Sequence, residues 1–163
     1  LLSGRAKVTN SDEEGREIIL AWLGPSEFFG EMGLIDSSPR SASVMAVEAC
    51  ELLNIGRDAF HRCMQDNFQV AQKLMQILVL RLRDADRKIE SLALLDVYGR
   101  VARLLLEMSV EEDGRRVVKK KMSKQDMARM IGASREMVSK VMRDLELSGY
   151  IVCEGDTITI MGD

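Results

Sequence analysis

Short apolar segments alternate with turn residues along the first part of the chain, up to about residue 60. Ile18, Leu20 and Trp22 recur at every second position, and residues 43–46 and 50–55 form two further short apolar runs. Alternation with a period of two between turn signals is typical of half-buried strands. The pattern therefore predicts an all-β domain in the form of a small barrel or roll.

The hydrophobic period changes to three and four residues between about 66 and 95. The apolar positions that follow this spacing are Ala71, Leu74, Leu78, Leu82, Ala85, Ile89 and Leu92. A stripe over some three heptads predicts a coiled-coil seam and hence a homodimer, with a monomeric core helix as the alternative. Met75, Ile77, Val79 and Leu80 make the first half apolar all round. We therefore expect a second face of this helix to pack on the β domain.

The last third of the chain has the pattern of a winged helix-turn-helix. Asp96 is placed as the N-cap of a new helix that extends to about Val110, which makes the junction a candidate hinge. A turn at 111–114 and a strand at 117–118 follow. Residues 123–149 then show two short amphipathic helices joined at Gly132-Ala133, with serine caps at positions 123 and 134. Residues 150–160 predict a β-hairpin, which would be the wing.

The second helix of this pair begins with charged side chains suited to DNA. Arg135 and Glu136 stand at its start, and Lys140 lies about one turn further along. Such side chains are used to read base edges in the major groove. A helical hairpin with a solvated charged face is the simpler alternative.

Charge is distributed unevenly along the chain, which favours the DNA-binding interpretation. The whole chain has a net charge of −3, yet residues 115–143 contain ten Lys or Arg and only two acids. A cationic segment within an acidic protein is typical of a face that binds duplex DNA. A solvated basic run without a partner is the alternative.

Composition excludes several other classes of protein. No apolar run approaches the roughly 18 residues that would span a membrane, and the three cysteines lack metal-ligand or disulfide spacing. We therefore expect reduced thiols, no metal site and a cytoplasmic location. His61 has no partner at metal-ligand spacing and no catalytic triad emerges, so we do not expect an enzyme. Because the chain opens on Leu1 in what resembles the middle of a strand, we expect a fragment that lacks its natural N-terminus.

A second group of residues with recognisable chemistry lies in the β domain. Gly30-Glu31 stands at the start of a short helical turn, where backbone N–H groups can face an anion. Arg40 can pair with a phosphodiester through two parallel hydrogen bonds, and the Ser41 hydroxyl is a third donor. Glu31 suits a ribose 2′-hydroxyl better than a phosphate. Together these four residues predict a pocket for a ribose that carries a cyclic phosphate.

Over nearly its whole length the chain resembles the Crp–Fnr family of catabolite activators and fumarate-nitrate-reductase regulators. The matching motifs are Phe29-Gly30-Glu31, Arg40-Ser41, Leu92-Ala93-Leu94-Leu95-Asp96-Val97, Gly99-Arg100 and Gly132-Ala133-Ser134-Arg135-Glu136. The resemblance implies an α+β protein with a cyclic-nucleotide-binding β-roll at 1–65, a dimerisation helix and hinge at 66–96, and a winged helix-turn-helix at 97–163. It also implies palindromic operators in double-stranded DNA and contact with RNA polymerase.

The resemblance also places the contacts to the effector base and to DNA. Members that respond to cyclic AMP offer the adenine a Thr-Ser pair from the dimerisation helix, at the positions held here by Ala85 and Asp86. Alanine cannot hydrogen-bond a base, and a carboxylate favours donors such as a guanine edge. Cyclic AMP, cyclic GMP, a cyclic dinucleotide and a degenerate, effector-independent pocket therefore all remain open. The expected DNA-binding residues are Lys124, Gln125, Ser134, Arg135, Glu136, Ser139 and Lys140.

Overall fold

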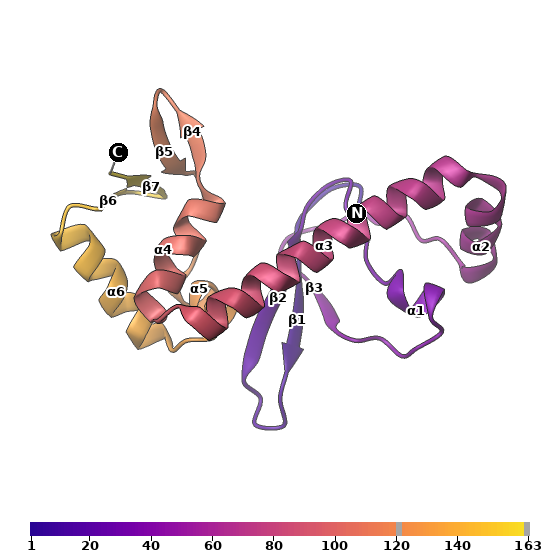
Figure 1. Cartoon of the computed structure of the whole chain (residues 1–163), viewed down its shortest axis with the longest axis horizontal. Helices are drawn as coiled ribbons and strands as arrows, with labels where there is room; N and C mark the ends of the chain where they lie inside the picture. Colours follow the sequence, from indigo (N-terminus) through magenta and orange to yellow (C-terminus); the bar gives the residue numbers. More distant parts are fainter. Residues whose placement is uncertain (120–121, 162–163) are drawn as a thin grey trace. The chain divides into compact units, whose positions relative to one another are not determined.

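The protein is described here by a computed structural model that covers residues 1–119 and 122–161. Lys120 and Lys121 of the basic run lie outside the described residues. The chain divides into two compact units, Leu1–Arg87 and Lys88–Asp163, and the long helix α3 (Phe68–Leu94) runs through the boundary between them (Figure 1). Within the described residues, no helix is both long and apolar enough to cross a bilayer.

Three antiparallel strands form the sheet of the first unit, in the order β2-β1-β3. Their bounds are Ala6–Ser11 for β1, Glu17–Leu23 for β2 and Ser43–Ala46 for β3. Ala6, Ile19 and Leu23 are buried, whereas Ile18 and Leu20 are exposed. The alternation predicted in β2 is therefore present, but the face with Ile19 and Leu23 is the buried one. Both faces of this strand are apolar, so the period alone could not choose between them.

The segment 50–55 is not the strand that its composition predicted. Its only strand-like pairing in the described chain is an isolated bridge between Glu51 and Ser3, and Leu52, Leu53 and Ile55 are exposed. A separate helix, α2 (Arg57–Asp66), follows this segment. Backbone pairing, rather than apolar character, decides whether such a run becomes a strand.

The helix predicted over about 66–95 is confirmed as α3, and α2 is a separate helix that precedes it. Asn67 is extended, with φ −136° and ψ 91°, and it separates α2 from α3. Along α3, Ala71, Leu74 and Leu78 are half-buried, and no residue is fully buried. Of the group expected to pack on the β domain, Met75, Val79 and Leu80 are exposed and only Ile77 is half-buried, so the expectation is wrong for those three residues.

The second unit is a winged helix-turn-helix, as expected. Its elements are α4 (Val97–Met108), β4 (Val110–Glu112), β5 (Arg115–Val118), α5 (Lys124–Ile131), α6 (Arg135–Leu147), β6 (Ile151–Glu154) and β7 (Thr157–Ile160). The strands form one antiparallel sheet in the order β4-β5-β7-β6. The structure confirms the wing hairpin and adds β4, which the sequence had suggested was part of a turn.

One apolar core holds the second unit together. It comprises Val101, Leu104, Leu105, Val118, Met127, Ala128, Ile131, Val138, Val141, Met142, Leu145, Ile151 and Ile158. These residues come from all three helices and from β5, β6 and β7. The core therefore fixes α6 against the rest of the unit and determines which of its faces reaches solvent.

Candidate effector-binding loop and DNA-binding face

The first candidate site is the loop 30–41, which we call the effector loop; it contains the short helix α1 (Met32–Ile35). The loop folds back on the guanidinium of Arg40, whose Nη1 donates a hydrogen bond to the carbonyl oxygen of Gly30. A Cβ atom on Gly30 would lie 2.7 Å from that nitrogen, and Gly30 has φ +83°. The left-handed backbone favours glycine at this position, and a Cβ atom would force the end of the Arg40 side chain to shift.

Glu31 is held at the start of α1 by a cation from α3. Only 6% of Glu31 is exposed, and its Oε1 accepts a hydrogen bond from Arg81 Nη1 at 2.7 Å. Arg81 Nη2 donates to the carbonyl oxygen of Phe28 at 2.5 Å, and the guanidinium carbon lies 4.7 Å from the Phe28 ring centroid. Arg81 was not among the residues predicted from the sequence. The available signal was a cation between Leu80 and Leu82, at the end of an apolar stretch of the helix.

The second oxygen of Glu31 is the least satisfied atom of the loop. Oε2 is buried and has no hydrogen-bond partner among the described residues. A buried acceptor without a donor is uncommon, and a hydroxyl of a bound molecule would satisfy it. This atom fits the ribose hydroxyl of a cyclic nucleotide.

The remaining predicted effector residues occupy three different positions. Ser41 is exposed, with its Oγ 4.0 Å from Met32 Sδ, so the hydroxyl makes only a weak contact in the loop. Ala85 follows Arg81 by four residues and shares its face of α3, whereas Asp86 points about 140° away around the helix. The structure thus brings Gly30, Glu31, Arg40 and Ser41 into one loop, but it does not bring Asp86 to the loop in the same chain.

The effector loop contains one carboxyl group with a clearly shifted pKa. The backbone N–H of Ser38 donates to Asp36 Oδ1 at 2.9 Å, and this bond, together with the Ser38 hydroxyl, lowers the pKa of Asp36. The charged form of Asp36 therefore stabilises the turn after α1. No group of three His, Cys, Asp or Glu side chains in the described part of the chain could hold a metal ion.

The second candidate site is the outer face of α6. Ser123 accepts from the Asp126 N–H at 3.0 Å and Ser134 from the Met137 N–H at 3.1 Å, which confirms both predicted caps. The intervening turn has Gly132 in the left-handed region at φ +63°. Arg100 Nη1, from α4, donates to the Ile131 carbonyl at 2.7 Å and so secures the end of α5.

Packing of α5 and α6 leaves most of the predicted DNA-binding side chains in solvent. Val138 is fully buried, and Val141, Met142 and Leu145 extend the same buried stripe. The exposed predicted residues are Lys124, Gln125, Ser134, Arg135, Glu136 and Lys140, and Ser139 is half-buried. Arg143, one turn beyond Lys140, is also exposed and was not among the predicted residues. The outer face of α6 can therefore offer hydrogen-bond donors and one carboxylate to a duplex.

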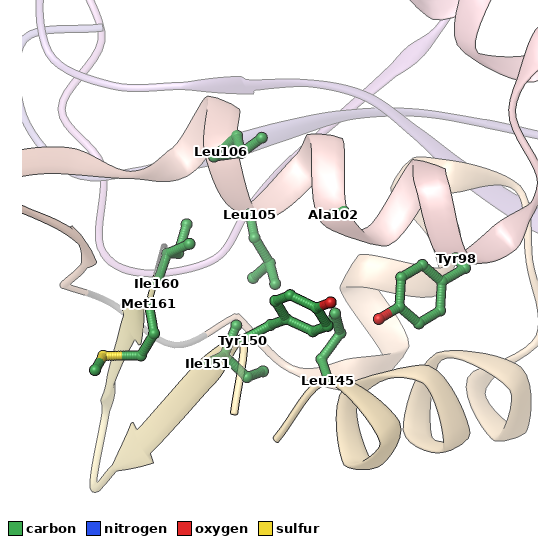
Figure 2. A pocket seen from close by; sticks show the side chains of 9 residues that line it. All are labelled: Tyr98, Ala102, Leu105, Leu106, Leu145, Tyr150, Ile151, Ile160 and Met161. Carbon is green, nitrogen blue, oxygen red and sulfur yellow. The ribbon is translucent and has the colours of Figure 1, made fainter. Parts of the chain in front are cut away.

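The second unit also contains an apolar pocket of about 280 Å³ (Figure 2). It is lined by Tyr98, Ala102, Leu105, Leu106, Leu145, Tyr150, Ile151, Ile160 and Met161. These residues belong to α4, the end of α6 and the wing. None of them is a predicted effector or DNA-binding residue, so the pocket is separate from both candidate sites.

Two family models match the two parts of the chain. Residues 1–67 match the cyclic nucleotide-binding domain, and residues 99–161 match the Crp-like helix-turn-helix domain. The first match contains the effector loop, and the second contains α5, α6 and the wing.

Known proteins are similar to this chain over nearly its whole length. A CRP-like cAMP-activated global transcriptional regulator of Mycobacterium tuberculosis H37Rv is 32% identical, over 98% of this chain and 73% of its own length. The cAMP-activated global transcriptional regulator Vfr of Pseudomonas aeruginosa is 34% identical, over 99% and 79%. The structure of the c-di-GMP-responsive global regulator CLP of Xanthomonas campestris superposes with a TM-score of 0.83 at 29% identity, covering 100% of this chain and 83% of that one.

Proposed function

The chain belongs to the Crp/Fnr family of transcription regulators, and from that premise we propose that a cyclic nucleotide in the effector loop controls binding of a homodimer to palindromic DNA. As a member of this family, the protein is a DNA-binding transcription regulator with a cyclic nucleotide-binding domain, and not an enzyme. The effector, the dimer, the contact with RNA polymerase and the cytoplasmic location are the proposed parts.

The chemistry of the effector loop supports a nucleotide with a cyclic phosphate. Arg40 and the Ser41 hydroxyl supply donors for phosphate oxygens, and both residues are exposed. The buried, unpartnered Oε2 of Glu31 is the observation that carries the proposal, because a ribose hydroxyl is a neutral donor of the right kind. A phosphate at this carboxylate would be repelled, so the two parts of the nucleotide have separate binding positions.

Arg81 connects the proposed effector site to the dimerisation helix α3. It joins the start of the effector loop to α3 through Glu31 and Phe28. A ribose that bonds to Glu31 changes the charge distribution at this ion pair, and therefore alters the interaction between loop and helix. The change would reach the DNA-binding unit through α3 and the Asp96 junction, and it would set two recognition helices about 34 Å apart, one turn of DNA.

The exposed apolar residues of α3 support the dimer. Leu82, Ile89 and Leu92 recur at seam positions and are each more than half exposed in the single chain. A second copy of α3 would bury them, as in a coiled coil. On DNA, Arg135 would bond to guanine, Glu136 would accept from a cytosine amine, and Lys140 would contact a base or phosphate.

Calorimetric titration of the full chain with cyclic AMP, cyclic GMP and cyclic di-GMP tests the proposal. We expect at least one of the three nucleotides to bind. Arg40→Ala should lower the affinity for that nucleotide, because its phosphate loses two hydrogen-bond donors. Arg62→Ala is the matched control, since Arg62 is an exposed cation on α2. Equal affinity of the wild type and Arg40→Ala for every ligand would show that Arg40 does not bind phosphate.

An effector-independent regulator is a second candidate, and one observation favours it. Arg40 already donates to Gly30, and Arg81 already bonds to one oxygen of Glu31, so both charged side chains of the proposed site have a partner within the chain. In that case the β domain would serve as a scaffold for the dimer. DNA affinity that is the same with and without each of the three nucleotides would support this candidate.

A further inference from the structure

We propose that Arg57, the first residue of α2, is a positioning residue that holds the effector loop in its nucleotide-binding shape. This inference rests on the proposed function of the loop. Arg57 is not among the residues proposed to touch the nucleotide, because its two hydrogen bonds go to Gly33 and Ser37.

Arg57 makes two hydrogen bonds to the effector loop across a long sequence separation. Its Nη2 donates to the carbonyl oxygen of Gly33 at 2.9 Å, and its Nη1 donates to Ser37 Oγ at 3.0 Å. Gly33 lies within α1, and Ser37 lies just beyond its end. One planar guanidinium thus joins both sides of the reversal that follows α1. A lysine ammonium could not hold both acceptors in a fixed geometry.

The position of Arg57 within α2 indicates that it is not there to stabilise its own helix. A cation in the first turn of a helix opposes the positive end of the helix dipole. No residue of α2 is buried, so apolar packing anchors this helix only weakly. The two bonds from Arg57 are therefore a substantial part of what attaches α2 to the effector loop.

The part of the loop that Arg57 contacts is tightly folded and needs restraint. A Cβ atom on Gly33 would lie 2.8 Å from the Ser38 carbonyl oxygen, so the chain returns very close to α1. Ser37 has φ +59°, a left-handed conformation that costs a non-glycine residue free energy. Arg40 and Ser41 come directly after this reversal, so its shape determines where their phosphate donors lie.

The effector loop is therefore held from two helices. Arg81 of α3 holds its beginning at Glu31 and also bonds to Phe28 just before it, and Arg57 of α2 holds its middle at Gly33 and Ser37. Without Arg57, the first half would keep its ribose acceptor while the second half would lose the fixed position of its phosphate donors. Nucleotide affinity should then fall although no group that touches the nucleotide has changed.

The test compares Arg57→Gln with Arg62→Gln, which removes another exposed cation from the same helix. Amide hydrogen exchange of the full chain without nucleotide is measured first. We expect faster exchange over residues 33–41 in Arg57→Gln only, with the exchange of β1 and β2 unchanged. Calorimetry then uses whichever of cyclic AMP, cyclic GMP and cyclic di-GMP binds the wild type. We expect Arg57→Gln to lower the affinity for that nucleotide roughly three- to tenfold, which corresponds to about 1 kcal/mol of binding free energy.

A third variant, Arg57→Lys, distinguishes the effect of the paired guanidinium donors from the effect of the positive charge. It keeps the positive charge near the loop but not the rigid pair of donors, so we expect it to behave like Arg57→Gln. Full affinity in Arg57→Lys, or wild-type exchange and affinity in Arg57→Gln, would overturn the inference. If the wild type binds none of the three nucleotides, the proposed function fails, and the exchange of residues 33–41 decides by itself whether Arg57 holds the loop.

Discussion

Replacement of Arg81 by alanine would leave the carboxylate of Glu31 buried without its cation. Glu31 is 6% exposed, and Arg81 is the only described side chain that is seen to bond to it. Removing one partner of a buried hydrogen-bonded ion pair leaves the desolvation cost of the other uncompensated. We therefore expect Arg81→Ala to destabilise the first unit well beyond the effect of an ordinary surface substitution.

Arg81→Ala removes three contacts: the hydrogen bond to Glu31, the hydrogen bond to the Phe28 carbonyl and the contact with the Phe28 ring. The expected loss of stability follows from them. A hydrogen bond to a charged group contributes about 1.5–3 kcal/mol, and an arginine over an aromatic ring about 0.5–1 kcal/mol. The side chain of Arg81 is 37% exposed, so solvent screens part of the interaction. Because these contributions are not additive, we expect a loss of about 2 kcal/mol in the free energy of unfolding.

Urea unfolding followed by the fluorescence of Trp22 measures this loss. Trp22 is the only tryptophan in the chain and lies in β2, 5.1 Å from the guanidinium carbon of Arg5, so its signal reports on the first unit. Protein concentration is held constant, because dimer formation would add to the measured stability.

Two further variants make the interpretation specific. Arg83→Ala removes an exposed arginine from the same helix and should change the unfolding free energy by less than about 0.5 kcal/mol. The double variant Glu31→Gln with Arg81→Met removes both charges and should recover part of the loss. The reasoning is refuted if Arg81→Ala destabilises the protein no more than Arg83→Ala.

Three further predictions concern other parts of the two sites. Ser134→Ala removes the cap on the Met137 N–H and should lower the stability of the second unit by about 1 kcal/mol; an unchanged thermal midpoint in circular dichroism contradicts this. Arg135→Ala should weaken operator binding by about 1–3 kcal/mol and relax preference at one base pair; gel shifts with wild-type selectivity would exclude that role. The pKa of Asp36 is lowered by Ser38, so its contribution to stability is present above the unfolded-state pKa and is lost as pH falls through the lower folded value; an NMR titration that shows an ordinary or raised pKa is the contrary result.

The sequence predicted the second unit well because its local signals agree with one another. Ser123 and Ser134 stand where helices begin, Gly132 stands where a left-handed residue is needed, and Val138 heads the buried stripe of α6. Caps, turn and period depend on residues close together in sequence. Their combination therefore predicts the helices, the turn and the exposed face of α6 without information on tertiary contacts.

The first unit was harder to predict because its decisive contacts are distant in sequence. Arg81 pairs with a residue 50 positions earlier, and Arg57 bonds to one 24 positions earlier. Residues 50–55 have the composition of a strand, but only Glu51 finds a backbone partner. The hydrophobic period of a segment describes that segment alone. The two arginine contacts and the pairing of residues 50–55 depend on which other segment packs against them.

Selection of bound duplexes from a random double-stranded DNA library tests whether a nucleotide controls binding of a homodimer to palindromic DNA. It should be performed on the full-length protein with and without each of cyclic AMP, cyclic GMP and cyclic di-GMP. The account predicts enrichment of a two-fold symmetric sequence whose half-sites are centred about 10 base pairs apart, with the yield changed by at least one nucleotide. Recovery of no preferred sequence, or of a single half-site without symmetry under every condition, would contradict it.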